Sequence, residues 1–132
     1  MRLPKLSAAV LLLVIGSLAT AVLALDLSNM QNLIPGQTAY ARNPKTGADF
    51  KMYFGNDKVV SEIHADGSIR QGDWRFRANG QICVQWHGTD DSQCYFMTAM
   101  GGQSYRFYTT NNQLYAIFNK IVYGRPPELT GY

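Results

Sequence analysis

The stretch that decides the fold is Trp74-Arg75-Phe76-Arg77-Ala78-Asn79-Gly80-Gln81-Ile82-Cys83-Val84-Gln85-Trp86. Large apolar residues alternate with polar ones on both sides of its central turn, which is typical of a β-hairpin with one buried face. A three-residue turn ending in a left-handed glycine at Gly80 pairs Trp74 with Val84. The alternative two-residue turn would mix polar and apolar residues on each face. The three-residue turn is therefore predicted.

The same pattern extends in both directions along the chain. From Gln37 onward, short aromatic and β-branched runs are separated by turn-forming residues every 8–13 positions. The runs cover residues 37–42, 48–54, 58–64, 68–77, 81–86, 93–99, 103–110 and 113–123. The links are too short for a crossover helix, so neighbouring strands pair antiparallel. We predict an all-β fold, an antiparallel meander of about eight strands that forms a curled sheet or a small barrel.

The other turns assign the remaining side chains to faces. Two-residue turns are expected at Asn56-Asp57 and Asn111-Asn112, and a three-residue turn at Ala65-Asp66-Gly67. The pairs that follow are Phe54–Val59, Phe50–Ile63, Ile63–Ile69, Leu114–Thr109, Ala116–Phe107 and Phe118–Tyr105. The expected inner face consists of Phe50, Met52, Phe54, Val59, Ile63, Ile69, Trp74, Phe76, Ile82, Val84, Trp86, Tyr95, Met97, Tyr105, Phe107, Leu114 and Phe118. The expected outer face carries Lys51, Glu62, Arg75, Arg77, Gln85 and Arg106.

Four segments divide the chain. Residues 1–24 read as a signal peptide, 25–36 as a short helix and linker, 37–123 as the β domain, and 124–132 as an extended tail. The first segment has a basic start, 19 uncharged residues at 6–24, and small residues at its end. Cleavage would leave Val22 or Leu25 as the first residue. The alternative is an uncleaved membrane anchor through residues 6–24.

Composition excludes several classes of protein. Of the 132 residues, 46% are hydrophobic and 16% charged, which is unlike a disordered chain or a coiled coil. Without residues 1–24, which contain Arg2 and Lys5, 108 residues remain with a formal charge of +1. A nearly neutral domain indicates no nucleic-acid partner. The expected partner is a protein or another component of the cell envelope.

The only two cysteines, Cys83 and Cys94, lie in the exported part of the chain. An even pair in an oxidising compartment is most simply one disulfide, and the hairpin between them places the two residues opposite one another. Together with the leader, this pair predicts a periplasmic or secreted protein.

A resemblance supports this location. The elements Gly72-Asp73-Trp74, Cys83-Val84-Gln85-Trp86 and Cys94-Tyr95 resemble a family of small exported bacterial domains of unknown function, over residues 36–110. That family implies no established chemistry.

Motifs for catalysis are absent from the sequence. There is no H-E-x-x-H, G-x-S-x-G, phosphate loop or dinucleotide fingerprint, so no enzyme and no cofactor are predicted. His87, Asp90 and Asp91, joined by His64, could hold a cation, but a polar hairpin loop is favoured and no metal is predicted. Four arginines could form an outer basic stripe, for which a solvated face is the favoured interpretation: Arg70, Arg75, Arg77 and Arg106.

One unusual surface remains. The predicted pairing places four large residues on the outer face, namely Phe96, Tyr108, Tyr115 and Ile117. Such a patch is either a partner site or is covered by segment 27–34 or the tail. We predict a non-catalytic binding or interaction domain of the cell envelope. The alternative is a small apolar-ligand carrier that uses the barrel interior.

Overall fold

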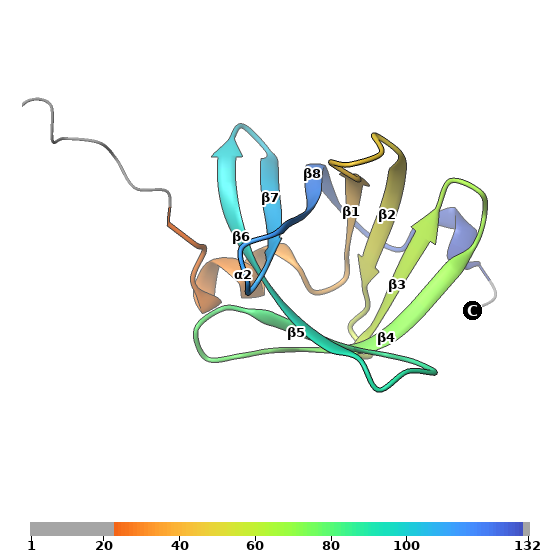
Figure 1. The fold of residues 1–132 in the computed structure, drawn as a ribbon, viewed down its shortest axis with the longest axis horizontal. Coiled ribbons are helices and arrows are strands. Elements are labelled where there is room, and N and C mark those ends of the chain that lie inside the picture. Colours follow the sequence, from red (N-terminus) through yellow and green to blue (C-terminus); the bar gives the residue numbers. More distant parts are fainter. Residues whose placement is uncertain (1–22, 131–132) are drawn as a thin grey trace, which may run out of the picture.

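The computed structural model describes residues 23–130, and its eight antiparallel strands close into a barrel in chain order (Figure 1). The prediction of an all-β antiparallel fold with a short N-terminal helix is confirmed. The elements are α2 (Leu27–Leu33), β1 (Gln37–Arg42), β2 (Asp49–Phe54), β3 (Val59–His64), β4 (Ile69–Phe76), β5 (Ile82–Trp86), β6 (Ser92–Gly101), β7 (Ser104–Thr109), β8 (Leu114–Tyr123) and the 3-10 turn η1 (Pro127–Leu129).

The deciding hairpin, β4–β5, has the predicted register. Trp74 pairs with Val84, and Gly80 takes the left-handed φ of 90°. A Cβ atom at Gly80 would lie 2.7 Å from the backbone of Asp26, so the close approach of the N-terminal segment also requires glycine here. The β3–β4 turn agrees as well, with Ile63 opposite Ile69.

The β2–β3 turn is one residue longer than predicted. Its loop has three residues, Asn56 to Lys58, and Lys58 adopts a left-handed φ of 70° without being glycine. Phe54 consequently pairs with Val60, and Phe50 with His64. A shift of one residue turns every side chain of a strand to the other face. The expectation that Val59 and Ile63 point inward is therefore wrong, and so is the outward placement of Glu62.

The β7–β8 turn also has three residues, and Asn112 takes the left-handed φ of 68°. A bulge between Phe107 and Tyr108 then absorbs the extra residue. The predicted pairs Ala116–Phe107 and Phe118–Tyr105 are confirmed. Leu114 lies opposite Tyr108 instead of Thr109, and Tyr115 turns toward the interior.

One end of the barrel is closed by α2, which lies beside the β4–β5 turn on the left of Figure 1. Asp26 caps the helix by accepting a hydrogen bond from the Asn29 backbone at 2.8 Å. Met30 and Ile34 of this segment are fully buried against the aromatic core. Phe54 and Trp74 meet there edge to face, with ring centroids 5.8 Å apart.

The residues before α2 complete the sheet at β6. β5 pairs with β6 only from Ser92 to Tyr95, whereas β6 continues to Gly101. Ala24 forms an antiparallel bridge with Thr98, and the Leu25 backbone N–H donates to the Met97 carbonyl at 2.8 Å. The N-terminal segment thus occupies the edge that β5 leaves free.

The tail beyond β8 packs more closely than an extended tail would. Its 3-10 turn η1 lies behind β3 and β4 on the right of Figure 1. Leu129 is buried, and the Glu128 carboxylate is 2.7 Å from the Lys51 ammonium. The tail therefore covers part of the outer face.

The predicted signal peptide lies almost entirely outside the described residues. Within residues 23–130, no helix has both the length and the apolar character needed to span a membrane.

Candidate functional site

The barrel end opposite α2 is open. Because the strands alternate in direction, the turns at 43–48, 65–68 and 110–113 all lie at this end. Between them is a cavity of about 490 Å³, which we call the mouth. Its lining residues are Asn43, Lys45, Ala48, Asp49, Phe50, Glu62, His64, Ala65, Asp66, Thr109, Gln113, Leu114 and Tyr115.

Glu62 forms the floor of the mouth and is only 2% exposed. Its Oε1 lies 2.9 Å from Nε2 of His64 and accepts a hydrogen bond from Nη2 of Arg70 at 3.1 Å. Its Oε2 accepts a hydrogen bond from the Tyr115 hydroxyl. Both oxygens of this buried carboxylate therefore have partners, as burial requires.

Arg70 bridges the same groups from the neighbouring strand. Its Nη2 also donates to the Tyr115 hydroxyl oxygen at 2.9 Å. Its guanidinium carbon is 3.7 Å from the centroid of the Trp86 ring, a close cation–π contact. The contacts with Glu62, Tyr115 and Trp86 fix the orientation of the guanidinium.

Tyr115 is held as a neutral phenol. Burial raises its pKa well above the ordinary value, and the nearby charge of Glu62 acts in the same direction. A neutral hydroxyl can donate to Glu62 while accepting from Arg70. Burial similarly raises the pKa of Tyr95, whose ring lies 5.2 Å from that of Tyr115.

The wall of the mouth is partly aromatic. The Phe50 and His64 rings stack with centroids 6.0 Å apart, and Phe50 meets the Tyr115 ring edge-on at 6.4 Å. Leu114 adds a further apolar side chain to the lining. The arrangement thus combines an apolar wall with a charged, fully hydrogen-bonded floor. It can hold a molecule that has both apolar and polar parts.

Sequence reasoning missed this site because of the two turns. Glu62 and His64 are two residues apart on one strand and hence on one face, but the assumed two-residue turn directed that face outward. The available signal was an acidic residue within the apolar run Val59-Val60-Ser61-Glu62-Ile63. A carboxylate in such a run is buried with partners or marks a site.

The four residues of the predicted outer patch separate in the structure. Phe96 and Tyr108 stack on the outer face with ring centroids 5.2 Å apart, and Ile117 is half-buried on β8. Tyr115 is inside the barrel, so its placement in this patch is wrong. The predicted alternative, in which segment 27–34 covers the patch, does not apply to Tyr115. The buried residues of this segment, Met30 and Ile34, pack into the core at the closed end of the barrel.

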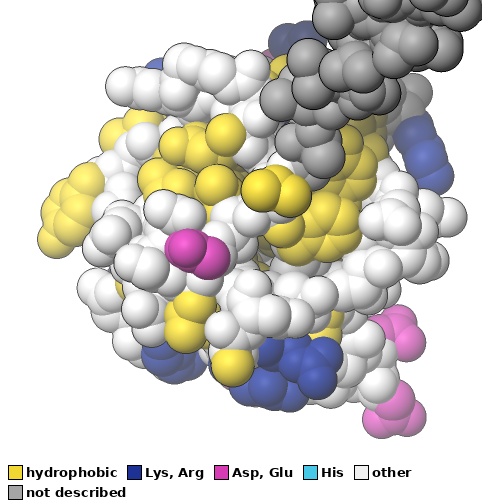
Figure 2. All heavy atoms as spheres, turned by 90° about the vertical axis from the view of Figure 1, so that its left-hand side faces the viewer, with side chains coloured by type: hydrophobic (Ala, Val, Ile, Leu, Met, Phe, Trp, Pro, Cys, Tyr) yellow, Lys and Arg dark blue, Asp and Glu magenta, His cyan; other side chains and the backbone are white. Residues whose placement is uncertain are grey.

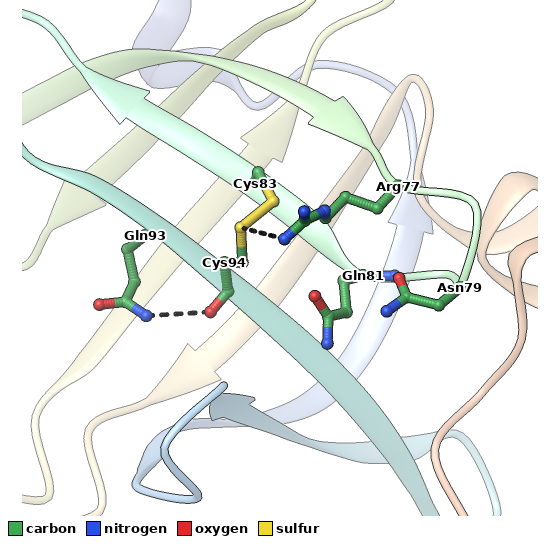
Figure 3. The surroundings of a disulfide bond; sticks show 6 residues. All are labelled: Arg77, Asn79, Gln81, Cys83, Gln93 and Cys94. Carbon is green, nitrogen blue, oxygen red and sulfur yellow. Dashed lines mark hydrogen bonds between the residues drawn. A yellow bond between two sulfur atoms is a disulfide. The ribbon is translucent and has the colours of Figure 1, made fainter.

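The expected disulfide joins neighbouring strands. Cys83 and Cys94 are register partners, and their sulfur atoms are 1.99 Å apart. Figure 3 shows the Arg77 guanidinium directed at this bond, with Nη1 3.9 Å from the Cys94 sulfur. The bond lies on the outer face, well separated from the mouth by the strands themselves.

The other candidate groups lie apart. His87 is 3.0 Å from the exposed Asp73 carboxylate rather than among Asp90 and Asp91. No set of three or more potential metal ligands gathers anywhere in residues 23–130. Arg70, expected in the outer stripe, points inward at the floor of the mouth.

Comparisons with family models, curated proteins and solved structures gave no match for this chain.

Proposed function

We propose that this protein is a non-catalytic binding domain that takes a small molecule into the mouth of its barrel. The observation that carries the proposal is the buried Glu62 with its three donors at the base of an open cavity. A buried ion pair costs desolvation free energy and often stabilises a fold no better than apolar residues would. Its position below a cavity of ligand size favours a role in binding.

The proposal modifies the apolar carrier predicted from sequence. A purely apolar ligand would leave the polar groups of His64 and Gln113 without water or a partner at the wall. The mixed lining instead favours a ligand with both characters. The closed end is filled by side chains, so the ligand would occupy the open half alone.

We further propose that the domain acts in the periplasm or outside the cell. The Cys83–Cys94 disulfide is compatible with an oxidising compartment. The basic and apolar leader at residues 1–24 and the resemblance to small exported bacterial domains support the same location.

Amide chemical shifts of the isotope-labelled protein, titrated with a library of small molecules, test the binding site. We expect ligands to shift the amide signals of Phe50, His64 and Tyr115 while those of Cys83 and Cys94 stay fixed. A library whose members shift only signals outside the mouth, or none, would refute the proposal.

A second candidate is the interaction surface around Phe96 and Tyr108. Both rings are half-exposed and stack on the outer face. Figure 2, which views the molecule from the side of α2 and the β6–β7 turn, shows hydrophobic side chains gathered near the middle of this side.

Photo-crosslinking from position 108 in producing cells should yield a discrete adduct, whereas the exposed position 123 should not. Equal yields from both positions would argue against a specific partner.

A further inference from the structure

The two sulfur atoms of the Cys83–Cys94 disulfide differ in access from solvent. Cys94 is half-buried and helps to line an open hollow of about 650 Å³ on the outer face. Cys83 is only 3% exposed. A reagent that enters the hollow therefore reaches the sulfur of Cys94 rather than that of Cys83.

The disulfide joins strands that the sheet already holds together. β5 pairs with β4 and β6 through backbone hydrogen bonds, and the two cysteines are only 11 residues apart. Closing so short a loop removes less entropy from the unfolded chain than closing a long one does. Accessible disulfides are also more typically labile than those enclosed in a core.

The hollow beside Cys94 has a positive charge. Nη1 of Arg77 lies 3.9 Å from Sγ of Cys94 (Figure 3). The other polar side chains of the lining are neutral, among them the amides of Asn79, Gln81 and Gln93. Within residues 23–130, no carboxylate lines this hollow or pairs with Arg77. The guanidinium charge is therefore available to an incoming anion.

A second guanidinium lies on the Cys83 side of the bond. Arg75 is the register partner of Cys83 on β4, so the two side chains are neighbours on the outer face. Asp73, the carboxylate of the same strand, is already 3.0 Å from Nε2 of His87. A positive charge close to a cysteine stabilises its thiolate, so Arg75 favours Cys83 as a leaving group.

We infer that Cys94 is a site of thiol–disulfide exchange with small anionic thiols, which the charge of Arg77 attracts into the hollow. The thiolate sulfur bonds to Sγ of Cys94 while the bond from Cys94 to Cys83 breaks. The electron pair of the broken bond leaves with Cys83, which then takes a proton from water. The small thiol is thus oxidised into a mixed disulfide with Cys94, and Cys83 is reduced to a thiol.

This modification is reversible, because Cys83 remains opposite Cys94 in the sheet and can attack the mixed disulfide in turn. The site is separate from the mouth. The inference therefore goes beyond the proposed function and does not depend on it.

Three thiols with the same two-carbon chain provide the test: anionic 2-mercaptoethanesulfonate, neutral 2-mercaptoethanol and cationic cysteamine. The rate at which each cleaves the disulfide of the folded protein is divided by its rate with the urea-unfolded protein. This ratio cancels differences in thiolate fraction and nucleophilicity between the reagents. We expect the ratio to be about five-fold higher for the sulfonate than for the neutral thiol, and lowest for cysteamine.

Variants identify Arg77 as the source of this preference. Arg77→Gln should make the three ratios nearly equal, and Arg77→Lys should restore the preference because it restores the charge. Arg42→Gln is the matched control, since Arg42 is exposed on β1, across the barrel from the disulfide, and should change nothing. Raising the salt concentration should reduce the preference in the wild-type protein, which decides the matter even if Arg77→Gln fails to fold.

The position of the adduct tests which sulfur is attacked. Early samples are quenched with acid and N-ethylmaleimide and analysed by tandem mass spectrometry. We expect the small thiol on Cys94 and the maleimide on Cys83. The reverse arrangement would overturn the inference, and so would equal ratios for the three thiols or a preference that survives Arg77→Gln. A cleavage rate that does not rise with thiol concentration would also overturn it, because exchange would then require unfolding.

Discussion

The two ends of the barrel differ in the interactions that stabilise their buried side chains. At the closed end, Phe54, Trp74 and Met30 pack among other apolar side chains with at most 2% exposure. At the mouth, Glu62 is equally buried, but its environment is His64, Arg70 and Tyr115. The first environment is stabilised by removal of apolar surface from water, the second by hydrogen bonds between charged or polar groups.

This difference shows at which end of the barrel the side chains can be replaced without loss of stability. A closed end without Trp74 would lose its packing, because large side chains fill the volume under α2. The mouth could be filled with apolar residues at little cost in stability, since buried ion pairs are replaceable in this way. The charged residues at the open end therefore point to a function, because folding does not require them. The aromatic residues at the closed end are explained by folding.

The largest effect is expected at the closed end. Trp74→Ala removes a buried ring and its Nε1 hydrogen bond to the Gly55 carbonyl, and should lower the free energy of unfolding by about 4 kcal/mol. Phe50→Ala at the half-exposed wall of the mouth should cost less than half as much. Urea unfolding of both variants measures the contrast. Similar losses would show that the two ends are packed alike.

Glu62→Gln should have the next largest effect. The amide keeps the shape but removes the charge that Arg70 faces and replaces an acceptor by a donor. A loss of about 2–3 kcal/mol in the free energy of unfolding is expected. Asp73→Asn, at the exposed pair with His87, is the matched control and should change stability by less than about 0.5 kcal/mol. Equal effects of the two variants would contradict a special role for the floor of the mouth.

Alkaline pH should destabilise the protein through the buried tyrosines. Folding raises the pKa of Tyr115, so the unfolded chain loses this proton first as the pH rises above about 10. The stability that is present below pH 10 then falls by roughly 1.4 kcal/mol per pH unit for each such tyrosine. Tyr115→Phe should make this loss shallower in urea unfolding at pH 10 to 11.5, whereas Tyr108→Phe should not. An unchanged slope in Tyr115→Phe would place the phenol in solvent.

The smallest effect concerns the turn that directs Tyr115 inward. Asn112 adopts a left-handed backbone without being glycine. Asn112→Gly should relieve this strain and raise the unfolding free energy by at most about 0.5–1 kcal/mol, because greater freedom of the unfolded chain opposes the gain. Gln113→Gly, with no such φ, should destabilise. A loss of stability in Asn112→Gly would indicate that the side chain itself holds the turn.

The fold was predictable from the sequence because glycine marks its decisive turns. Gly67 and Gly80 reveal three-residue turns, and the register of β3–β4 and β4–β5 follows directly from them. The cysteine pair adds the register of β5–β6. Together these positions set the register of three consecutive strand pairs, from β3 to β6.

The candidate site was not predictable from the sequence, because the two turns that orient its residues carry no glycine at their left-handed positions. Lys58 and Asn112 occupy the left-handed positions of the other two turns, and neither residue type demands that conformation. The ammonium of Lys58 lies 4.4 Å from the Trp74 ring centroid, a contact across strands that no local pattern reveals. Each turn thus appeared one residue shorter than it is, and Glu62 and Tyr115 were assigned to the outer face.

The pairing of Ala24 and Leu25 with β6 has a consequence for self-association. A strand edge with free N–H and carbonyl groups is a template on which another chain can add a strand. In this molecule the backbone on both sides of Met97 is occupied only because the chain just before α2 lies against it. Shortening the chain past Leu25 would open that edge beside the half-exposed Phe96. Ala24 and Leu25 therefore protect this strand edge from edge-to-edge assembly with another chain.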